Sequence, residues 1–349
     1  MTLDGHFISR VERSTVRSRY PRTIGRNARL GSHGDGGVDE IVVLHTDTGK
    51  SGWGLAAGLV PEDVVGRPVE ELIDPANGVR EPGLRGLDFA LHDLAGHILD
   101  LPVHALLGGR GSTTTPCYDG AIYFADLDDA GGVDAVLAHC AADDSADYRA
   151  FKLKIGRGNR WMERAEGDAR DIEVTRAVRA AYPEHRILVD ANDGYDCDGF
   201  IEYLKAVADC DLYWVEEPFL DDATDLARLK KHLQGSQTLI AEGESDPDLE
   251  PLLEIAAKGD IDVLLMDVVS FGLTSWREVM PRITCQASPH AWGLPLKTLY
   301  AAQLAAGLGN VPTVEGVPGT TDGVDTTAYR WEDGNLTVPD RPGFGLTLT

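Results

Sequence analysis

FKLKI at residues 151–155 opens a series of short apolar runs that decide the fold. Each run ends in or contains a polar or charged residue near its end, and the later members are ILVDAN (187–192), YWVEEP (213–218), TLIAEGE (238–244), VLLMD (263–267), TCQASPH (284–290) and VPTVE (311–315). Uninterrupted apolar runs are typical of parallel strands that are covered on both faces. The series therefore predicts a parallel sheet with chemical groups at the carboxyl ends of its strands.

The spacing of these strand-end residues predicts a barrel. Counted from Lys154, and with Glu244 as the fourth marker, successive markers lie 36, 26, 28, 23, 23 and 25 residues apart. Each interval accommodates one strand, one helix and two loops, which is the repeat of a (β/α)8 barrel of about 250 residues. In such a barrel the carboxyl ends of the strands meet at one mouth, so we expect the marker residues to form a single site.

The remaining sequence predicts two further parts of an α/β protein. Residues 1–112 contain strand and turn signals at 41–54 and an apolar helical stripe up to Leu101, which indicate an N-terminal α+β capping domain. Residues 113–320 form the predicted barrel. Residues 321–349 are rich in glycine, proline and threonine, and we expect them to pack back on the capping domain.

Composition narrows the function classes. The chain has 349 residues and a formal net charge of −25, which argues against nucleic acid and anionic membranes as partners. No apolar run approaches the ~18 residues of a membrane span, and no signal pattern opens the chain, so we expect a cytoplasmic protein. The five cysteines lack CxxC spacing, which indicates reduced thiols without a zinc site. We also expect a homo-oligomer.

Asp190, Glu216 and Glu244 end three successive predicted strands. Three converging carboxylates repel one another unless a cation lies among them, and hard oxygen ligands suit Mg²⁺. Any one of them alone would be interpreted as a solvated acid or a helix cap. Glu242 shares a strand face with Glu244 and is the alternative third ligand. We prefer Glu244 because Gly243 frees the backbone in front of it.

Two amines and an imidazole supply candidate acids and bases. Lys152 and Lys154 point to the same face of their strand. Because a divalent cation nearby disfavours further positive charge, we expect one lysine to have a lowered pKa and to act as a base. Asp267 and His290 end neighbouring strands, where the carboxylate would orient the ring and support its protonated form. Glu315 is either a protonated acid that donates to an oxyanion or a salt-bridge partner.

An arginine-rich segment stands out in this acidic chain. Residues 10–29 hold seven arginines and one acid, Glu12. The segment could close over the site and bind a distal anionic or polyhydroxyl end of a substrate. The alternative is a surface patch that pairs with acidic neighbours or with a second subunit. The candidate substrate-binding residues are Arg19, Arg22, His33, Asn192 and Trp292.

These motifs together resemble the enolase superfamily, and within it the mandelate racemase subgroup. The resemblance covers nearly the whole chain and rests on Lys152-Leu153-Lys154, Asp190-Ala191-Asn192, Trp214-Val215-Glu216-Glu217-Pro218, Gly243-Glu244-Ser245, Asp267 and Ser288-Pro289-His290. One departure is Ser270-Phe271-Gly272-Leu273, which replaces a glycine pair usual in the family and leaves the pocket shape open.

The resemblance implies a modified, enolase-like (β/α)8-type barrel with its capping domain. It implies one Mg²⁺ on Asp190, Glu216 and Glu244. Lys154 would be one base, and Asp267 with His290 would form the opposite acid/base. Lys152 and Glu315 would lie beside the substrate carboxylate.

The expected reaction is abstraction of the α-proton of a small hydroxylated carboxylate by Lys154 or His290, with Mg²⁺ stabilising the enediolate. We favour β-elimination of water from a sugar acid, which gives a 2-keto-3-deoxy acid. Return of the proton by the opposite group would instead give a racemase or epimerase, and a cycloisomerase of a hydroxy acid or sugar-acid lactone is a further alternative. Two more distant alternatives are a Schiff-base lysine aldolase, which borohydride would trap, and a non-catalytic sugar-acid-binding barrel, which would exchange no α-proton in D₂O.

Overall fold

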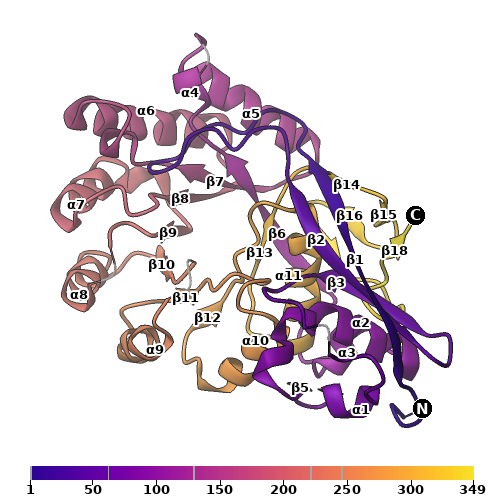
Figure 1. The fold of residues 1–349 in the computed structure, drawn as a ribbon. Coiled ribbons are helices and arrows are strands. Elements are labelled where there is room, and N and C mark those ends of the chain that lie inside the picture. Colours follow the sequence, from indigo (N-terminus) through magenta and orange to yellow (C-terminus); the bar gives the residue numbers. More distant parts are fainter. Residues whose placement is uncertain (1, 62, 129, 221, 245–246) are drawn as a thin grey trace.

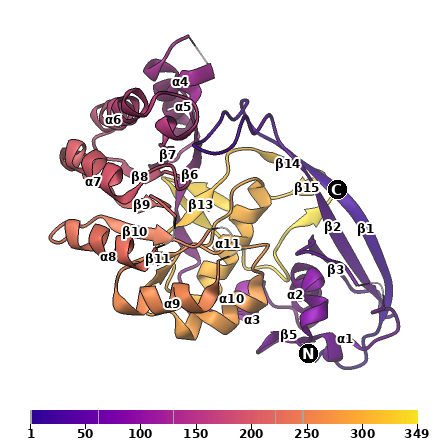
Figure 2. The same cartoon turned by 60° about the vertical axis from the view of Figure 1, so that its left-hand side comes forward.

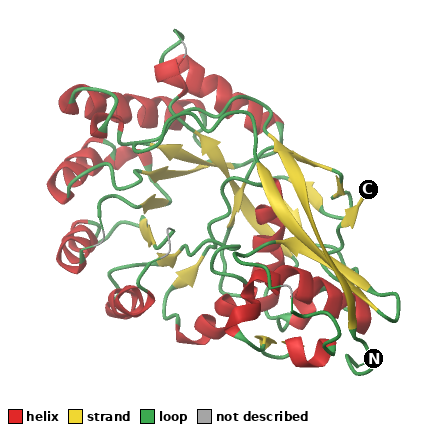
Figure 3. Cartoon of the chain, in the orientation of Figure 1, coloured by secondary structure: helices red, strands yellow, loops and turns green. Residues whose placement is uncertain are grey.

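A computed structural model describes residues 2–61, 63–128, 130–220, 222–244 and 247–349 of the chain (Figure 1). It shows a mixed α/β fold with an antiparallel sheet and a longer, mostly parallel sheet whose helices lie on the outside (Figure 3). Among these residues, no helix has the length and apolar character needed to cross a bilayer.

The antiparallel sheet is built mainly from the first 55 residues. Its strands follow the order β14-β1-β2-β3, with β1 at Ile8–Arg19, β2 at Val38–Thr46, β3 at Ser51–Leu55 and β14 at Thr320–Asp322. Buried residues of β2, among them Val42 and Leu44, share a core with the apolar side chains of α2 (Asp88–Leu99). The smaller elements nearby are α1 (Val69–Leu72), β4 (Ile73–Asp74), β5 (Gly78–Val79), η1 (Pro82–Leu87) and α3 (Val103–Leu106).

Eight strands of the second sheet run parallel to one another. They are β6 (Thr114–Ile122), β7 (Ala150–Lys154), β8 (Arg186–Asp190), β9 (Trp214–Glu216), β10 (Leu239–Glu242), β11 (Val263–Leu264), β12 (Gln286–Ala287) and β13 (Val314–Gly316). Most of their residues are buried, as the uninterrupted apolar runs predict.

The strand order brings the first and the last of these strands together. Each strand from β6 to β11 pairs with the next one along the chain, and β13 pairs with β6. Between β12 and β13, Ala287 N donates to Asn310 O at 3.0 Å and Ser288 Oγ donates to Thr313 O at 2.9 Å. This order is consistent with the predicted (β/α)8-type barrel, except that the described residues between β13 and β14 form no helix.

Helices connect the parallel strands and cover their outer side (Figure 2). They are α4 (Ala125–Asp128), α5 (Val133–Ser145), α6 (Arg164–Ala181), α7 (Cys197–Ala206), α8 (Ala223–His232), α9 (Leu249–Lys258), α10 (Leu273–Val279) and α11 (Pro295–Leu308), with short turns η2 (Arg157–Asn159), η3 (Ala208–Cys210) and η4 (Met280–Arg282). The i, i+4 pair Val174 and Val178 of α6 is buried, and polar residues take the other face.

The segment after β13 contacts both sheets. Its strand β14 pairs antiparallel with β1, through Arg17 opposite Asp322. The hairpin β16–β17 (Arg330–Glu332 and Asn335–Thr337) extends the second sheet beside β6, and β15 (Val324–Asp325) pairs with β18 (Thr347–Leu348). Phe344 also packs on Phe89 of α2, with ring centroids 6.0 Å apart. The segment therefore contacts the N-terminal part of the chain, and its hairpin adds a contact with β6 that the sequence did not suggest.

Candidate active site

The three predicted carboxylates converge at the carboxyl ends of consecutive strands. Asp190 is the last residue of β8, Glu216 is the last of β9, and Glu244 follows β10 by two residues. One oxygen from each lies within 4.8 Å of the others. Asp190 and Glu216 are buried and Glu244 is partly buried, so the site is enclosed by the sheet on one side and open on the Glu244 side.

Gly243 explains how Glu244 reaches the other two. Its φ is +97°, a left-handed conformation that glycine adopts without strain, and a Cβ there would lie 2.7 Å from Leu252 Cδ2. The chain therefore turns after β10 and directs Glu244 towards Asp190 and Glu216. This geometry supports Glu244 over Glu242 as the third member of the group. Ser245, part of the motif quoted above, lies outside the described residues.

The two lysines lie against these carboxylates. Lys152 Nζ is 2.6 Å from Glu216 Oε1 and 3.4 Å from Asp190 Oδ2, and Lys154 Nζ donates to Asp190 Oδ2. Both lysines are buried at the end of β7. Their ammonium groups also lie near aromatic faces, Lys152 5.5 Å from the ring centroid of Tyr118 and Lys154 5.2 Å from that of Tyr123.

The protein's own groups raise the pKa of both lysines. Burial lowers the pKa of Lys154, but the Asp190 carboxylate outweighs it and holds the pKa above its ordinary value. Burial acts likewise on Lys152, where Glu216 and Glu315 raise the pKa far more. The lowered lysine pKa that we expect beside a bound cation stays a prediction, because it depends on the charge of that cation.

The histidine and its carboxylate partner form a bonded pair. His290 Nδ1 lies 3.0 Å from Asp267 Oδ2, and His290 Nε2 lies 3.2 Å from Glu244 Oε1. Burial lowers the pKa of His290, but the carboxylates of Glu244, Glu315 and Asp267 more than offset it and raise the pKa above its ordinary value. These carboxylates favour the protonated form of the imidazole next to the third strand-end carboxylate.

Glu315 behaves as a salt-bridge partner. It is 0 % exposed, its Oε1 lies 2.8 Å from Lys152 Nζ, and its Oε2 accepts from Ala291 N at 2.8 Å. Burial raises the pKa of Glu315, but Lys152 and His290 offset it and bring the pKa down to about 2. Of the two interpretations left open by the sequence, the ionised partner of Lys152 is the one that this geometry supports.

The lowered pKa of Glu315 makes a prediction for acid stability. A carboxyl with a folded-state pKa below its unfolded value contributes stability above the unfolded pKa, and that contribution is lost as the pH falls through the folded one. We expect the free energy of unfolding of wild type to exceed that of Glu315→Gln most above about pH 4.5. The difference should shrink by on the order of 3 kcal/mol towards pH 2. Urea unfolding of both proteins between pH 3 and 7 measures it, and a difference that grows in acid would contradict the ion pair.

Three of the five candidate substrate-binding residues lie beside this group. His33 packs edge-on against Tyr123 at 4.8 Å and against Trp292 at 6.1 Å, and Tyr123 faces Lys154. Trp292 stacks on Tyr20 at 5.7 Å. Asn192 has a buried Oδ1 without a hydrogen-bond partner, and its backbone N donates to Asp190 Oδ1 at 2.9 Å.

Arg19 and Arg22 do not join them, which corrects the prediction. Arg19 makes an exposed ion pair with Asp322, 2.7 Å from Nη2 to Oδ2. Arg22 makes a partly buried bidentate ion pair with Asp143 of α5, in which Nη1 and Nη2 each donate to one carboxylate oxygen. Most arginines of the segment 10–29 have acidic partners in this way, and the other pairs are Arg10–Glu12, Arg13–Glu40, Arg26–Asp128 and Arg29–Asp193. The alternative, a patch that pairs with acidic neighbours, is the one the structure supports.

Known proteins share the fold of this chain and part of its sequence. A sequence model of the family described as enolase C-terminal domain-like matches residues 135–349. The chain belongs to the enolase superfamily. A galacturonate dehydratase from Geobacillus sp., crystallised in complex with Mg, is 32% identical to it, with 98% of this chain and 93% of that chain covered and a TM-score of 0.93.

Relatives within the enolase superfamily differ in reaction. An arabinonate dehydratase from Saccharolobus solfataricus is 27% identical over 284 residues, which cover 78% of this chain and 71% of that protein. A D-galactarolactone cycloisomerase from Agrobacterium fabrum is 25% identical over 352 residues, which cover 88% of each. Likeness alone therefore identifies an enolase-superfamily enzyme whose homologues include both lyases and isomerases.

The carboxylate group fits the Mg²⁺ that the superfamily implies. Burial raises the pKa of Glu216 to about 8, with Asp190 and Glu244 adding to the rise in spite of Lys152. Burial likewise raises the pKa of the adjacent Glu217 to about 10, with further contributions from Glu244 and Asp190. Three carboxylates whose oxygens lie within 4.8 Å of one another, and which raise the pKa of Glu216 and Glu217 in addition to burial, are a donor set that fits a hard divalent cation.

Sequence reasoning missed two residues of this enolase-type site. Lys297 of α11 donates to Asp267 Oδ2 at 2.8 Å, so it shares that oxygen with His290. Tyr123 follows β6 directly and faces Lys154. Tyr123 could have been found as the end of the first predicted strand, but nothing in the sequence links Lys297 to Asp267.

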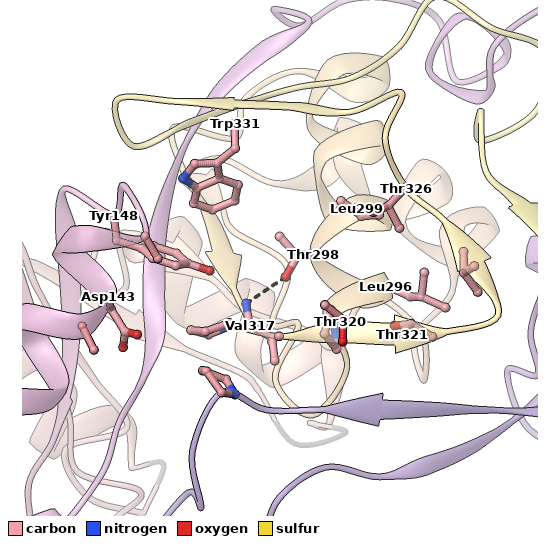
Figure 4. Close-up of a pocket in the computed structure, with 17 residues that line it drawn as sticks. Asp143, Tyr148, Leu296, Thr298, Leu299, Val317, Thr320, Thr321, Thr326 and Trp331 are labelled. Atoms are coloured by element: carbon pink, nitrogen blue, oxygen red, sulfur yellow. Dashed lines mark hydrogen bonds between the residues drawn. The ribbon is translucent and has the colours of Figure 1, made fainter.

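Cavities lie near and away from the carboxylates. One of about 220 Å³ is lined by Asp267 and Lys297, behind His290. Another, of about 440 Å³, lies between α5, α11 and the C-terminal segment, where Tyr148, Leu299 and Trp331 form part of its wall (Figure 4). The carboxylates, lysines and histidine of the site do not line this larger cavity, so we do not assign it to the reaction.

Proposed function

We propose that the protein is a Mg²⁺-dependent sugar-acid dehydratase that removes the α-proton of a hydroxylated carboxylate and eliminates the β-hydroxyl as water. The observation that carries this proposal is the placing of two different acid/base groups on the outer members of the carboxylate triad. Lys154 bonds Asp190 at one side and His290 lies 3.2 Å from Glu244 at the other. A substrate carbon between them would have a base and an acid within reach.

The residues take distinct roles in this proposal. Asp190, Glu216 and Glu244 would hold the cation, which when bound supplies positive charge to the substrate carboxylate and weakens the hold of Asp190 on the Lys154 proton. Lys154 Nζ, in its neutral form, takes the α-proton. His290 Nε2, held protonated, gives its proton to the departing β-hydroxyl, which leaves as water. Protonation of the resulting enol at the β-carbon completes the 2-keto-3-deoxy acid.

In this proposal, the buried neighbours of the reacting groups position the substrate and His290. Lys152 and the ionised Glu315 lie 2.8 Å apart beside the triad, and we propose that Lys152 Nζ steadies the substrate carboxylate. Asp267 holds the tautomer and orientation of His290 by accepting from Nδ1. The buried Oδ1 of Asn192, which lacks a partner, is the acceptor we assign to a substrate hydroxyl.

The surroundings favour a substrate with one carboxylate. Arg19 and Arg22, the cations expected to bind a distal anion, are paired with Asp322 and Asp143 instead. The distal side is lined by aromatic rings, with Trp292 4.9 Å from Tyr123. Flat apolar faces suit the C–H face of a sugar more than a second carboxylate, so we propose an aldonic or uronic acid. The galacturonate dehydratase from Geobacillus sp. was also crystallised with D-galacturonate and 5-keto-4-deoxy-D-galacturonate, which supports a uronic acid as a candidate.

The alternative reactions can be distinguished from dehydration by experiment. A cycloisomerase or epimerase would use the same groups, and it would show α-proton exchange without keto-acid formation. A Schiff-base lysine aldolase would be trapped by borohydride with a keto acid, and removal of the metal would leave its activity largely unchanged. We also propose that residues 1–112 form a capping domain on a modified (β/α)8-type barrel (113–320), with 321–349 packed back, and that the enzyme is a cytoplasmic homo-oligomer.

A substrate screen with and without Mg²⁺ tests the proposal. We expect D-galacturonate or an aldonate of five or six carbons to yield a keto acid only with Mg²⁺, and Glu244→Gln to lower kcat/KM by about 10³-fold through loss of a charged ligand. The control is Asp262→Asn, at the residue just before β11. It breaks the ion pair between Asp262 and Lys230, whose charged atoms lie 2.5 Å apart, and should leave turnover within about twofold. Keto-acid formation in the presence of a chelator, or turnover of diacids alone, would contradict the proposal.

A further inference from the structure

A buried ionic cluster lies directly behind the end of β7, between α4 and α6. Arg157 and Asp171 are both 0 % exposed. Arg157 Nη1 donates to Asp171 Oδ1 at 2.6 Å, and Nη2 donates to Asp126 Oδ1 at 2.6 Å. Its guanidinium also lies 4.2 Å from the ring centroid of Phe124. Apolar residues of similar volume often replace buried ion pairs without loss of stability, so stability alone does not explain this cluster.

Asp171 joins two different loops of the site. Its Oδ2 accepts from Gly156 N at 2.7 Å and from Arg157 N at 3.2 Å, both in the turn after β7. The same oxygen accepts from the hydroxyl of Tyr195 at 2.6 Å, in the loop between β8 and α7. One carboxylate of helix α6 therefore holds the loops that follow two neighbouring strands (Figure 1).

Each of these loops begins at a residue of the proposed active site. Gly156 lies two residues after Lys154, and Tyr195 lies five residues after Asp190. Arg157 Nη1 also donates to Lys154 O at 3.3 Å. Gly156 itself has φ +93°, and a Cβ there would lie 2.8 Å from Ala28 Cβ and 3.0 Å from Ala191 O. The turn behind Lys154 is thus enclosed and has little room to shift unless Asp171 releases it.

We propose that Asp171 is a positioning residue, which fixes the Lys154 amine relative to Asp190 by holding the loops after β7 and β8 to one carboxylate. The inference rests on the proposed function for the role of Lys154. It does not depend on the identity of the sugar acid. A displacement of about 1 Å in a reacting group can cost about 10²-fold in rate. We therefore expect the hydrogen bonds of Asp171 to affect kcat more than substrate binding.

Two tyrosine-to-phenylalanine substitutions, each of which removes one hydroxyl oxygen, test the positioning role of Asp171. Tyr195→Phe removes the hydroxyl that bonds Asp171. The control Tyr203→Phe removes another buried hydroxyl of the same region, which bonds Thr175 Oγ1 of helix α6 at 2.8 Å and makes no hydrogen bond to the Asp171 carboxylate. We expect Tyr195→Phe to lower kcat about tenfold with KM within about twofold. Tyr203→Phe should keep kcat within about twofold.

Asp171→Asn tests the carboxylate itself. Asparagine keeps the size and one acceptor, but it turns an amide donor or a neutral oxygen towards the guanidinium of Arg157. We expect kcat to fall about 100-fold, measured well below the melting temperature on protein shown to be folded by circular dichroism. An activity-independent readout is hydrogen exchange at residues 155–157, whose amides should exchange faster in Asp171→Asn than in wild type and in Tyr203→Phe.

The outcomes separate the two proposals. Wild-type kcat in folded Tyr195→Phe and Asp171→Asn, or an equal loss in Tyr203→Phe, would overturn the positioning role. Unchanged exchange at residues 155–157 in Asp171→Asn would overturn it as well. If Asp171→Asn does not fold, the tyrosine pair decides. If wild type turns over no sugar acid, the proposed function fails, and the exchange measurement alone decides whether Asp171 holds the turn.

Discussion

Replacing Lys154 with alanine is expected to lower kcat by about 10²- to 10⁴-fold, the range by which a general base contributes to catalysis. Lys154 is buried at the end of β7 and bonds Asp190, so no other amine except Lys152 lies on that face of the strand in the described chain. Lys152 is engaged by Glu216 at 2.6 Å and Glu315 at 2.8 Å and cannot take its place. The readout is α-proton exchange of the substrate in D₂O, followed by proton NMR.

Two controls make the Lys154→Ala result specific. Small primary amines added to the variant should restore part of the exchange, because the cavity left by the side chain exposes the position of Nζ. Lys230→Ala removes a lysine that pairs with Asp262 before β11 begins, and it should leave exchange within about twofold. Full exchange in Lys154→Ala would show that the base is a different group. Loss of exchange that amines do not restore, together with lost Mg²⁺ binding, would instead indicate a collapsed site.

The regular part of this molecule could be predicted from its sequence. Strand ends repeat at intervals that a strand, a helix and two loops must fill, and parallel strands bring those ends to one edge. The convergence of Asp190, Glu216 and Glu244 within 4.8 Å is confirmed for this reason. The choice of Glu244 also followed from local chemistry, since glycine at position 243 permits the turn that the chain makes there.

The partners of long side chains could not be predicted. In a chain with 57 acids, each arginine has many possible partners, and the sequence does not say that Arg22 meets Asp143 of α5, 121 residues away. The carboxylates around Lys154 could not be counted from the sequence for a related reason, because the fold decides how many of them it brings to one amine. The link between Asp171 and Tyr195 likewise depends on the angle at which α6 lies behind β7 and β8.

Replacing His290 with asparagine is expected to separate two steps of the proposed reaction. The asparagine side chain would keep a polar contact with Asp267 but could not deliver a proton to the leaving hydroxyl. We expect keto-acid formation to fall about 10³-fold, while α-proton exchange stays within about tenfold because Lys154 still takes the proton. His185→Asn, which alters a histidine that lies 3.0 Å from Asp144 outside the site, is the control and should change neither rate.

The ratio of the two rates in His290→Asn decides between mechanisms. Exchange that continues without elimination supports Lys154 as the base and His290 as the acid. An equal fall of exchange and elimination would show that His290 takes the α-proton and that Lys154 has the opposite role. If wild type itself exchanges the proton without forming a keto acid, the raised pKa of His290 would serve reprotonation of the α-carbon. The enzyme would then be an epimerase that uses the same two groups, because inversion needs a base on one side of the carbon and a protonated acid on the other.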